Sequence, residues 1–216
     1  EMGWADMLVQ LGLPYDSEEA LELAEKVQRF ISQRAKEASV ELAIEKGVFG
    51  SFEGSKYDTG KLEDRVRNVE RTTIAPTGTI AMLYEVGSGI EPFFSLAYVK
   101  NIRGGDSLTY VNKHFTKVAK ERGFYSEELM KKIAEKGGIL SGIDEIPNDV
   151  KKVFKTSQEL SIDAHVKMQA AFQKYTDNAV SKTINMRNDV SVDEVKKAYM
   201  ESWKTGCKGI TIYRDG

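Results

Sequence analysis

The stretch VSKTINMRNDVSVDEVKKAYMESWKTGCKGITIY, residues 180–213, decides the fold. Its β-branched beginning, residues 180–185, predicts a strand, and residues 208–213 predict a second one. Between them, Ser191 and Glu194 have the spacing of a capping box, which predicts the start of a helix. Two strands joined through a helix by short connections lie parallel, with a right-handed crossover. The sequence therefore predicts an α/β fold with parallel strands.

The rest of the chain alternates in the same way between helical and extended patterns. The clearest helix is predicted over residues 17–46, where Ser17 is a good N-cap and Gly47 supplies the stop. Its predicted buried face consists of residues at helical spacing: Leu23, Val27, Phe30, Ile31, Ala35, Ala38 and Leu42. Further helical patterns cover residues 111–122, 126–135 and 160–178.

A short run, residues 71–75, predicts another strand, and it leads through Pro76-Thr77-Gly78-Thr79 into a helical segment from Ile80. In parallel α/β proteins, ligands lie beyond the carboxyl ends of strands. A helix start offers unpaired N–H groups that attract phosphate, and Gly78 lets the backbone come close to an anion. The hydroxyl groups of Thr77 and Thr79 add donors. From these four residues alone, an ordinary turn with Thr79 as a helix cap is the favoured interpretation.

Four other residues are weaker candidates for a site. Glu91 precedes Pro92 and is either a positioned carboxylate or, as we expect, a turn residue facing solvent. His114 and His165 have no Cys or acidic partner at ligand spacing, so we expect structural histidines. Cys207 has no nearby second cysteine, which favours a packed thiol over a nucleophile.

Composition excludes several classes of protein. The chain has 216 residues, 41% of them hydrophobic and 30% charged, with a formal net charge of -2. No basic stripe interleaved with aromatic residues is present, so nucleic acid is not an expected partner. No apolar run approaches the roughly 20 residues of a bilayer span, so no membrane partner is expected. A lone cysteine gives no internal disulfide, and we expect a cytoplasmic protein. Neither end has a polar linker, so we expect the chain to be part of a longer one.

Longer blocks of sequence carry a family resemblance. Residues 71–80, followed by Ser88-Gly89-Ile90-Glu91-Pro92, resemble the large catalytic chain of ribonucleotide reductases, and most closely the adenosylcobalamin-dependent class II enzymes. Later family blocks occur in the expected order, and the resemblance covers essentially the whole chain. These blocks are residues 12–17, 165–171, 181–185 and 208–216.

The resemblance implies a fold and a site. The family fold is a ten-stranded α/β barrel around a finger loop, and residues 1–216 would be its carboxy-terminal part, incomplete in this chain. By motif position, the substrate-phosphate-binding residues are Pro76, Thr77, Gly78, Thr79 and Ile80. The family's reaction reduces ribonucleotides to deoxyribonucleotides through a cysteine thiyl radical, which class II enzymes make by homolysis of the cobalt–carbon bond of adenosylcobalamin.

The resemblance also implies what the chain lacks. The family's Asn-x-Cys-x-Glu finger motif and its pair of reducing cysteines are missing, and Cys207 matches neither. We therefore assign no catalytic residue and no metal ligand, and we expect the isolated chain to be inactive. The implied partners are a ribonucleotide substrate, the remainder of the barrel and a thioredoxin-like reductant. A homodimer is also expected, since a partial barrel exposes sheet edges.

Two alternatives stay open. The first is a segment of an iron-dependent class I large chain, which needs a radical-supplying partner subunit. Those relatives carry paired tyrosines near the final strand, whereas Tyr213 stands alone before Arg214, which favours class II. The second alternative is a non-catalytic phosphate-binding module.

Overall fold

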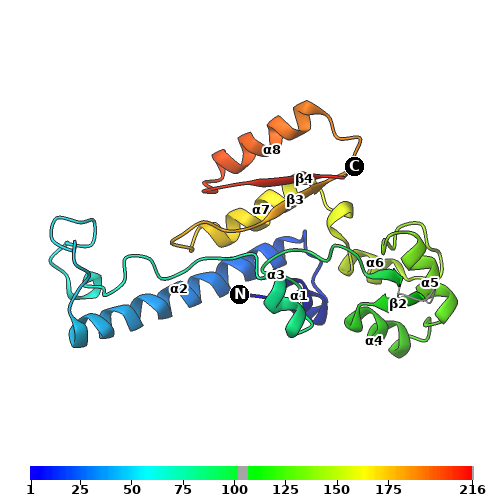
Figure 1. Cartoon of the computed structure of the whole chain (residues 1–216), viewed down its shortest axis with the longest axis horizontal. Coiled ribbons are helices and arrows are strands. Elements are labelled where there is room, and N and C mark those ends of the chain that lie inside the picture. Colours follow the sequence, from blue (N-terminus) through cyan, green and yellow to red (C-terminus); the bar gives the residue numbers. More distant parts are fainter. Residues whose placement is uncertain (102–106, 216) are drawn as a thin grey trace.

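The computed structural model describes residues 1–101 and 107–215 of the chain. One long helix, α2 (Glu18–Lys46), follows the short helix α1 (Trp4–Leu11) and extends from the centre of the molecule to one end (Figure 1). A layered unit of strands and helices lies beside the first half of α2, and a separate lobe lies beyond its amino-terminal end (Figure 1). None of the described helices combines the length and the apolar character that a bilayer crossing requires.

The layered unit is the predicted parallel strand–helix–strand. Strands β3 (Thr183–Met186) and β4 (Thr211–Arg214) pair in parallel, with Thr183 opposite Thr211, and helix α8 (Val192–Lys204) connects them. The capping box of Ser191 and Glu194 is present at the start of α8. The parallel α/β prediction is therefore confirmed for this unit.

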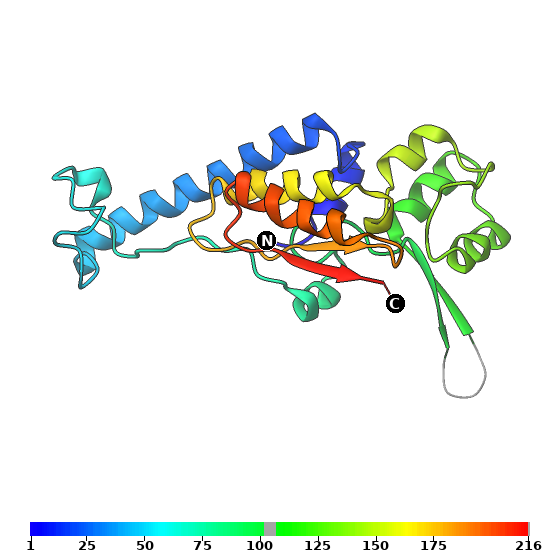
Figure 2. The ribbon, with the colours of Figure 1, turned by 90° about the horizontal axis from the view of Figure 1, so that it is seen from above.

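Helices α7 (Ile162–Gln173) and α8 lie on the same side of β3 and β4 (Figure 2). Ile184 and Met186 of β3 are buried against Val166 of α7 and Ala198 of α8. Ile212 of β4 packs against the same cluster. Because side chains alternate along a strand, Thr183 and Asn185 of β3 and Thr211 and Tyr213 of β4 face away from these helices. One face of the sheet is thus covered by helices within this chain.

The predicted strand over residues 71–75 is reduced to a single parallel bridge, between Ile74 and Val180. Ile74 accepts a hydrogen bond from the N–H of Ser181 at 2.8 Å, and its own N–H donates to Ala179 at 3.4 Å. The bridge places this segment beside the residues that lead into β3. The described residues therefore contain three parallel extended segments and no closed barrel.

Helix α2 begins and ends as predicted, with the Ser17 side chain accepting from the N–H of Ala20 and Gly47 as C-cap. The predicted buried face is only partly right. Leu23 and Val27 are partly buried and pack against the core, but the fully buried residues of α2 are Ala20, Ala24, Gln28, Ser39 and Ala43, and Phe30 is 60% exposed. The reason is that the second half of α2 extends away from the body of the molecule towards the loop after Gly47 (Figure 1).

Residues 93–101 and 107–156 form the separate lobe. It contains an antiparallel hairpin, β1 (Ala97–Asn101) and β2 (Ser107–Val111), which projects from the molecule (Figure 2). Its helices are α4 (Lys113–Glu121), α5 (Glu127–Glu135) and α6 (Asn148–Val153), the first two as predicted. They close over an apolar core that includes Phe115, Met130, Ile133, Leu140 and Ile143.

Candidate functional site

The turn after the Ile74 bridge has an unusual backbone. Thr77 has φ 55° and ψ 17°, the left-handed region, and the short helix α3 (Gly78–Leu83) starts immediately after it. This conformation costs an L-residue roughly 1–2 kcal/mol, and it is rare for a β-branched side chain. Two hydrogen bonds support it. The Thr77 hydroxyl oxygen accepts from the N–H of Gly89 at 2.8 Å, and the Thr77 carbonyl accepts from the N–H of Ala81 at 2.9 Å.

The turn presents unpaired backbone donors to solvent. Within the described part of the chain, the N–H groups of Gly78, Thr79 and Ile80 have no hydrogen-bond partner, and all three residues are exposed. Thr79 lies inside α3, and the N-cap position belongs to Thr77, which makes no side-chain cap bond. The interpretation of Thr79 as a helix cap is therefore wrong. The turn thus presents three consecutive amide donors that a ligand's acceptor atoms can satisfy.

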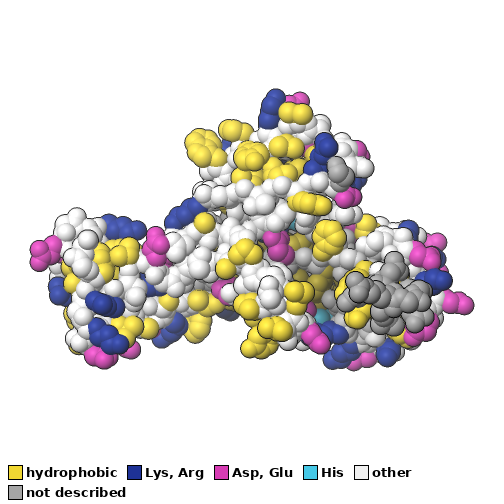
Figure 3. Space-filling model, viewed as in Figure 1, with side chains coloured by type: hydrophobic (Ala, Val, Ile, Leu, Met, Phe, Trp, Pro, Cys, Tyr) yellow, Lys and Arg dark blue, Asp and Glu magenta, His cyan; other side chains and the backbone are white. Residues whose placement is uncertain are grey.

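Apolar side chains surround this turn on α3. Ile80, Met82, Leu83 and Tyr84 are exposed, and hydrophobic side chains gather over α3 in the lower centre of Figure 3. Exposed apolar side chains gathered in this way are typical of an interaction surface.

The loop of residues 87–91 supports the turn from behind. Gly89 has φ +50°, and a Cβ there would lie 3.3 Å from the carbonyl oxygen of Ala75, so the close approach to the turn requires glycine. The amino-terminal segment holds this loop through the carboxylate of Asp6, which accepts from the N–H of Gly87 at 2.7 Å. The Tyr15 hydroxyl donates to the carbonyl of Ile90 at 2.6 Å. Burial, with the charge of Glu91, raises the pKa of Tyr15 well above its usual value, so it is a neutral donor.

Glu91 connects the same loop to strand β3. One carboxylate oxygen accepts from the N–H of Thr183 at 2.6 Å, and the other accepts from Nζ of Lys182 at 2.9 Å. The Glu91 side chain is 26% exposed, whereas that of Lys182 is fully buried. The expectation that Glu91 faces solvent is wrong, and the alternative, a positioned carboxylate, is confirmed. Lys182 was missed because a lysine at the start of a strand gives no sequence signal of burial.

His165 completes a buried polar network. Its Nδ1 lies 2.9 Å from Nζ of Lys182, and its Nε2 lies 3.0 Å from the carbonyl of Ser157. Lys182 also donates to the carbonyl of Thr183 at 3.0 Å, so three acceptors match the three N–H donors of an ammonium group. His165 is then neutral, with its proton on Nε2. Burial and the nearby charge of Lys182 lower the pKa of His165 to about 3. The prediction of a structural histidine is confirmed.

The remaining candidate residues show no reactive arrangement. His114 Nε2 lies 3.2 Å from an oxygen of Asp6. In the part of the chain that the structure describes, no three His, Cys, Asp or Glu side chains come together as a metal site. Cys207 is half-buried, and burial raises the pKa of its thiol. A raised pKa lowers the thiolate fraction that nucleophilic chemistry needs.

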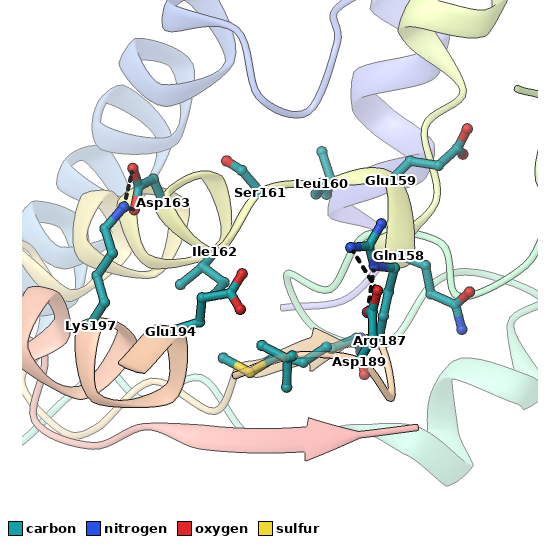
Figure 4. A pocket seen from close by; sticks show the side chains of 13 residues that line it. Gln158, Glu159, Leu160, Ser161, Ile162, Asp163, Arg187, Asp189, Glu194 and Lys197 are labelled. Atoms are coloured by element: carbon teal, nitrogen blue, oxygen red, sulfur yellow. Dashed lines mark hydrogen bonds and ion pairs between the residues drawn. The ribbon is translucent and has the colours of Figure 1, made fainter. Parts of the chain in front are cut away.

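A groove of about 430 Å³ lies between the start of α7 and the loop after β3, shown in Figure 4. Four of its charged side chains form two ion pairs: Lys197 lies 2.9 Å from Asp163, and Arg187 lies 3.1 Å from Asp189. The carboxylates of Glu159 and Glu194, which also line it, accept hydrogen bonds from the N–H groups of Thr156 and Ser191. None of the turn residues 76–80 lines the groove. Its charged side chains thus have partners within the chain, whereas the N–H groups of the turn have none, so the turn is the better candidate site.

The fold and the turn together define a class: a parallel α/β protein with unpaired amide donors beyond the carboxyl end of an extended segment. Comparison with known families gives a more specific result. The sequence model of the family described as ribonucleotide reductase, barrel domain, matches residues 1–213. The chain belongs to this ribonucleotide reductase family.

Individual homologous proteins agree with the family assignment. The chain is 46% identical over 214 residues to the vitamin B12-dependent ribonucleoside-diphosphate reductase of Thermoplasma acidophilum, covering 99% of this chain and 27% of that protein. It is 42% identical over 215 residues to the protein of the same name from Mycobacterium tuberculosis, covering 100% of this chain and 30% of that protein. The chain thus spans less than a third of the length of these relatives.

A solved structure shares the fold. The alpha subunit of the class Id ribonucleotide reductase of Actinobacillus ureae matches with a TM-score of 0.84 at 25% sequence identity. The match covers 100% of this chain and 38% of that one.

Proposed function

We propose that this chain is the substrate-phosphate-binding part of the catalytic barrel of a vitamin B12-dependent ribonucleotide reductase. In this proposal the phosphates of a ribonucleotide bind at Pro76, Thr77, Gly78, Thr79 and Ile80. The observation that carries it is the strained Thr77, followed by three exposed N–H groups without partners. Family membership supports a ribonucleotide as the anion that these donors bind.

The turn's contribution is positional. Its segment from Pro76 to Leu83 contains no Lys or Arg, so the donors are backbone N–H groups and the Thr79 hydroxyl. Such donors fix a phosphate group in direction and distance without the point charge of a lysine. A phosphate fixed in this way fixes the ribose attached to it, and holding reactants in place lowers the entropic barrier to reaction.

We propose further that residues 1–216 form the carboxy-terminal portion of a ten-stranded α/β barrel. The bridge segment at Ile74 and strands β3 and β4 would then be neighbouring parallel strands, with α7 and α8 on the outside. The face opposite these helices carries Thr183, Asn185, Thr211 and Tyr213 by alternation along the strands. The remainder of the barrel would cover this face and the exposed apolar residues of α3.

In the whole protein we propose the reduction of ribonucleotides to deoxyribonucleotides, with a thioredoxin-like reductant and a homodimeric assembly. The two sequence relatives described above are named as vitamin B12-dependent, so class I is not the proposal. With Cys207 as its only cysteine, this chain holds no redox pair, and we assign it no catalytic residue.

The cofactor proposed for the whole protein is adenosylcobalamin, which supplies a homolysable cobalt–carbon bond when bound. The two histidines of the chain already have partners and would not hold this cofactor. His165 is bonded through both ring nitrogens, and His114 lies against Asp6. We therefore assign no contact with this cofactor to the described residues and derive no step through it.

The test uses the full-length reductase with Thr77→Ala and Thr79→Ala combined. Loss of two hydroxyl groups, each worth about 0.5–1.5 kcal/mol as a hydrogen-bonding group, raises the KM for ribonucleotide by about tenfold. Cobalamin homolysis, followed spectroscopically, survives. Thr109→Ala on the exposed surface of β2 is the matched control and leaves the KM unchanged. An unchanged KM in the double variant would contradict the proposed site.

A further inference from the structure

The proposed phosphate-binding turn does not hold its own conformation. The left-handed Thr77 depends on a side-chain contact with Gly89, in the loop of residues 87–91. A strained residue of this kind persists only when its surroundings determine it from several sides. The conformation of Thr77 therefore depends on the contacts that hold this loop.

Two parts of the chain hold the loop: the amino-terminal segment and the start of β3. On one side, the N–H of Gly3 donates to the carbonyl of Gly87 at 2.8 Å, and Asp6 and Tyr15 bind the loop as described above. On the other side, Glu91 is bonded to the backbone of β3 at Thr183 and to the buried ammonium of Lys182. Tyr15 belongs to both sides, because its ring lies 5.9 Å from Nζ of Lys182.

Stability alone does not explain a buried Lys–Glu pair. Removing an ammonium group from water is costly, and burial lowers the pKa of Lys182 although the charge of Glu91 opposes that shift. A well-packed apolar pair of similar volume is often as stable or more so. The ionic pair instead fixes how the loop of residues 87–91 is oriented against β3. All three ammonium donors and both carboxylate oxygens have assigned partners, so the loop can take one position against β3.

We propose that Glu91 and Lys182 are positioning residues for ribonucleotide phosphate. They fix the loop of residues 87–91 against β3, the loop fixes Thr77 through Gly89, and Thr77 aims the N–H groups of Gly78 to Ile80 at the ligand. Neither residue touches the phosphate. This inference rests on the proposed phosphate-binding function of the turn.

The first experiment measures binding of a ribonucleoside diphosphate to the full-length protein by equilibrium dialysis without cobalamin. Lys182→Met keeps the length of the buried side chain and removes the ammonium, and the freed Glu91 carboxylate can be hydrated because it is partly exposed. We expect the Kd to rise about tenfold, the effect of losing one charge-assisted contact. With cofactor and reductant present, KM rises similarly while kcat stays within about twofold, because the chemistry is untouched.

Two further variants control for loss of fold. Lys197→Met removes a lysine that is paired with Asp163 on the surface, and it leaves the Kd unchanged. Glu91→Gln keeps an acceptor for the N–H of Thr183 and breaks only the ionic contact. If Lys182→Met does not fold, this variant tests whether the ion pair positions the turn. It too raises the Kd about tenfold.

A double-mutant cycle separates positioning from general destabilisation. If Lys182 acts through Thr77, then Lys182→Met adds little to the loss already caused by Thr77→Ala, so the two effects on Kd are not additive. Additive effects, or a lowered Tm with an unchanged Kd, would overturn the inference. If Thr77→Ala and Thr79→Ala leave the Kd unchanged, the proposed function itself fails. If they weaken binding while Glu91→Gln does not, only the positioning role fails.

Discussion

The separate lobe, residues 93–101 and 107–156, and the site region around the turn bury different kinds of side chain. The lobe closes over an apolar core around Phe115, Ile133 and Leu140. Beside apolar residues such as Ile74 and Ile90, the site region also buries the polar side chains of Lys182, His165 and Gln169, each with a hydrogen bond to backbone or to a charged partner. Apolar packing has no fixed direction, whereas a hydrogen-bonded network sets positions. The difference suggests that the lobe contributes stability and that the polar network contributes geometry.

The largest expected effect is a loss of local stability in the lobe that leaves ligand binding at the site unchanged. Phe115 is fully buried and packs edge-on against Phe154 with ring centroids 5.5 Å apart. Phe115→Ala removes this packing and leaves a cavity, which costs about 3–5 kcal/mol of local stability. Amide hydrogen exchange in the lobe of the full-length protein measures this loss.

The same variant tests whether the two regions are separate. The Kd for a ribonucleoside diphosphate should stay within about twofold of the wild-type value, because the apolar cluster around Phe115 includes no residue of the turn or of its supporting loop. A loss of affinity as large as that of Lys182→Met would show that the two regions act as one.

The next largest effect is a loss of stability at low pH that arises from the buried His165 of the site network. The folded pKa of His165, about 3, lies below the unfolded value of about 6.5, so between these values the unfolded chain binds a proton that the folded chain does not. His165 therefore contributes full stability above pH 6.5 and loses about 1.4 kcal/mol per pH unit as the pH falls towards 3. The groups that face it are Lys182 and the carbonyl of Ser157, with Glu91 beyond Lys182.

Comparison with His165→Gln isolates this contribution. The difference in unfolding free energy between wild type and variant should be constant well above pH 6.5 and shrink as the pH is lowered from 6.5 to 5.5. Parallel curves for the two proteins would mean that folding does not lower the pKa of His165.

The smallest effect tests a cap remote from both regions. The Ser191 side chain accepts from the N–H of Glu194, and the Glu194 carboxylate accepts from the N–H of Ser191 at 2.8 Å. Ser191→Ala costs about 1 kcal/mol of helix stability. Hydrogen exchange in the first turn of α8 should accelerate accordingly, with the Kd for ribonucleotide unchanged. Equal exchange in both proteins would show that α8 does not depend on its cap.

The sequence predicted what local chemistry determines. Ser17 and Ser191 start helices as expected, and β3 and β4 pair in parallel on either side of α8. Helix α7 ends at Gln173, before the predicted residue 178, because the Gln173 side chain donates to the carbonyls of Thr176 and Asn178 and closes a turn. That side-chain contact gives no periodic signal.

Tertiary contacts account for the other differences. Phe30 fits a helical stripe but is 60% exposed, because the face of α2 that packs there is the one that carries Gln28, whose side chain donates to the hydroxyl of Thr176. Glu91 reads as a turn residue because its partners, Lys182 and Thr183, lie about ninety residues further along the chain. The turn itself was located from its residues and from the family resemblance, whereas the left-handed Thr77 and its contact with Gly89 required coordinates.

The most direct test of the central claim follows the amides of the turn themselves. Exposed N–H groups without partners exchange rapidly with solvent deuterium, and a bound phosphate that accepts their hydrogen bonds slows this exchange. In the full-length protein, we predict that a saturating ribonucleoside diphosphate protects the peptide spanning residues 77–83, while the matching ribonucleoside does not. Equal deuterium uptake at this peptide with and without the diphosphate would contradict the account.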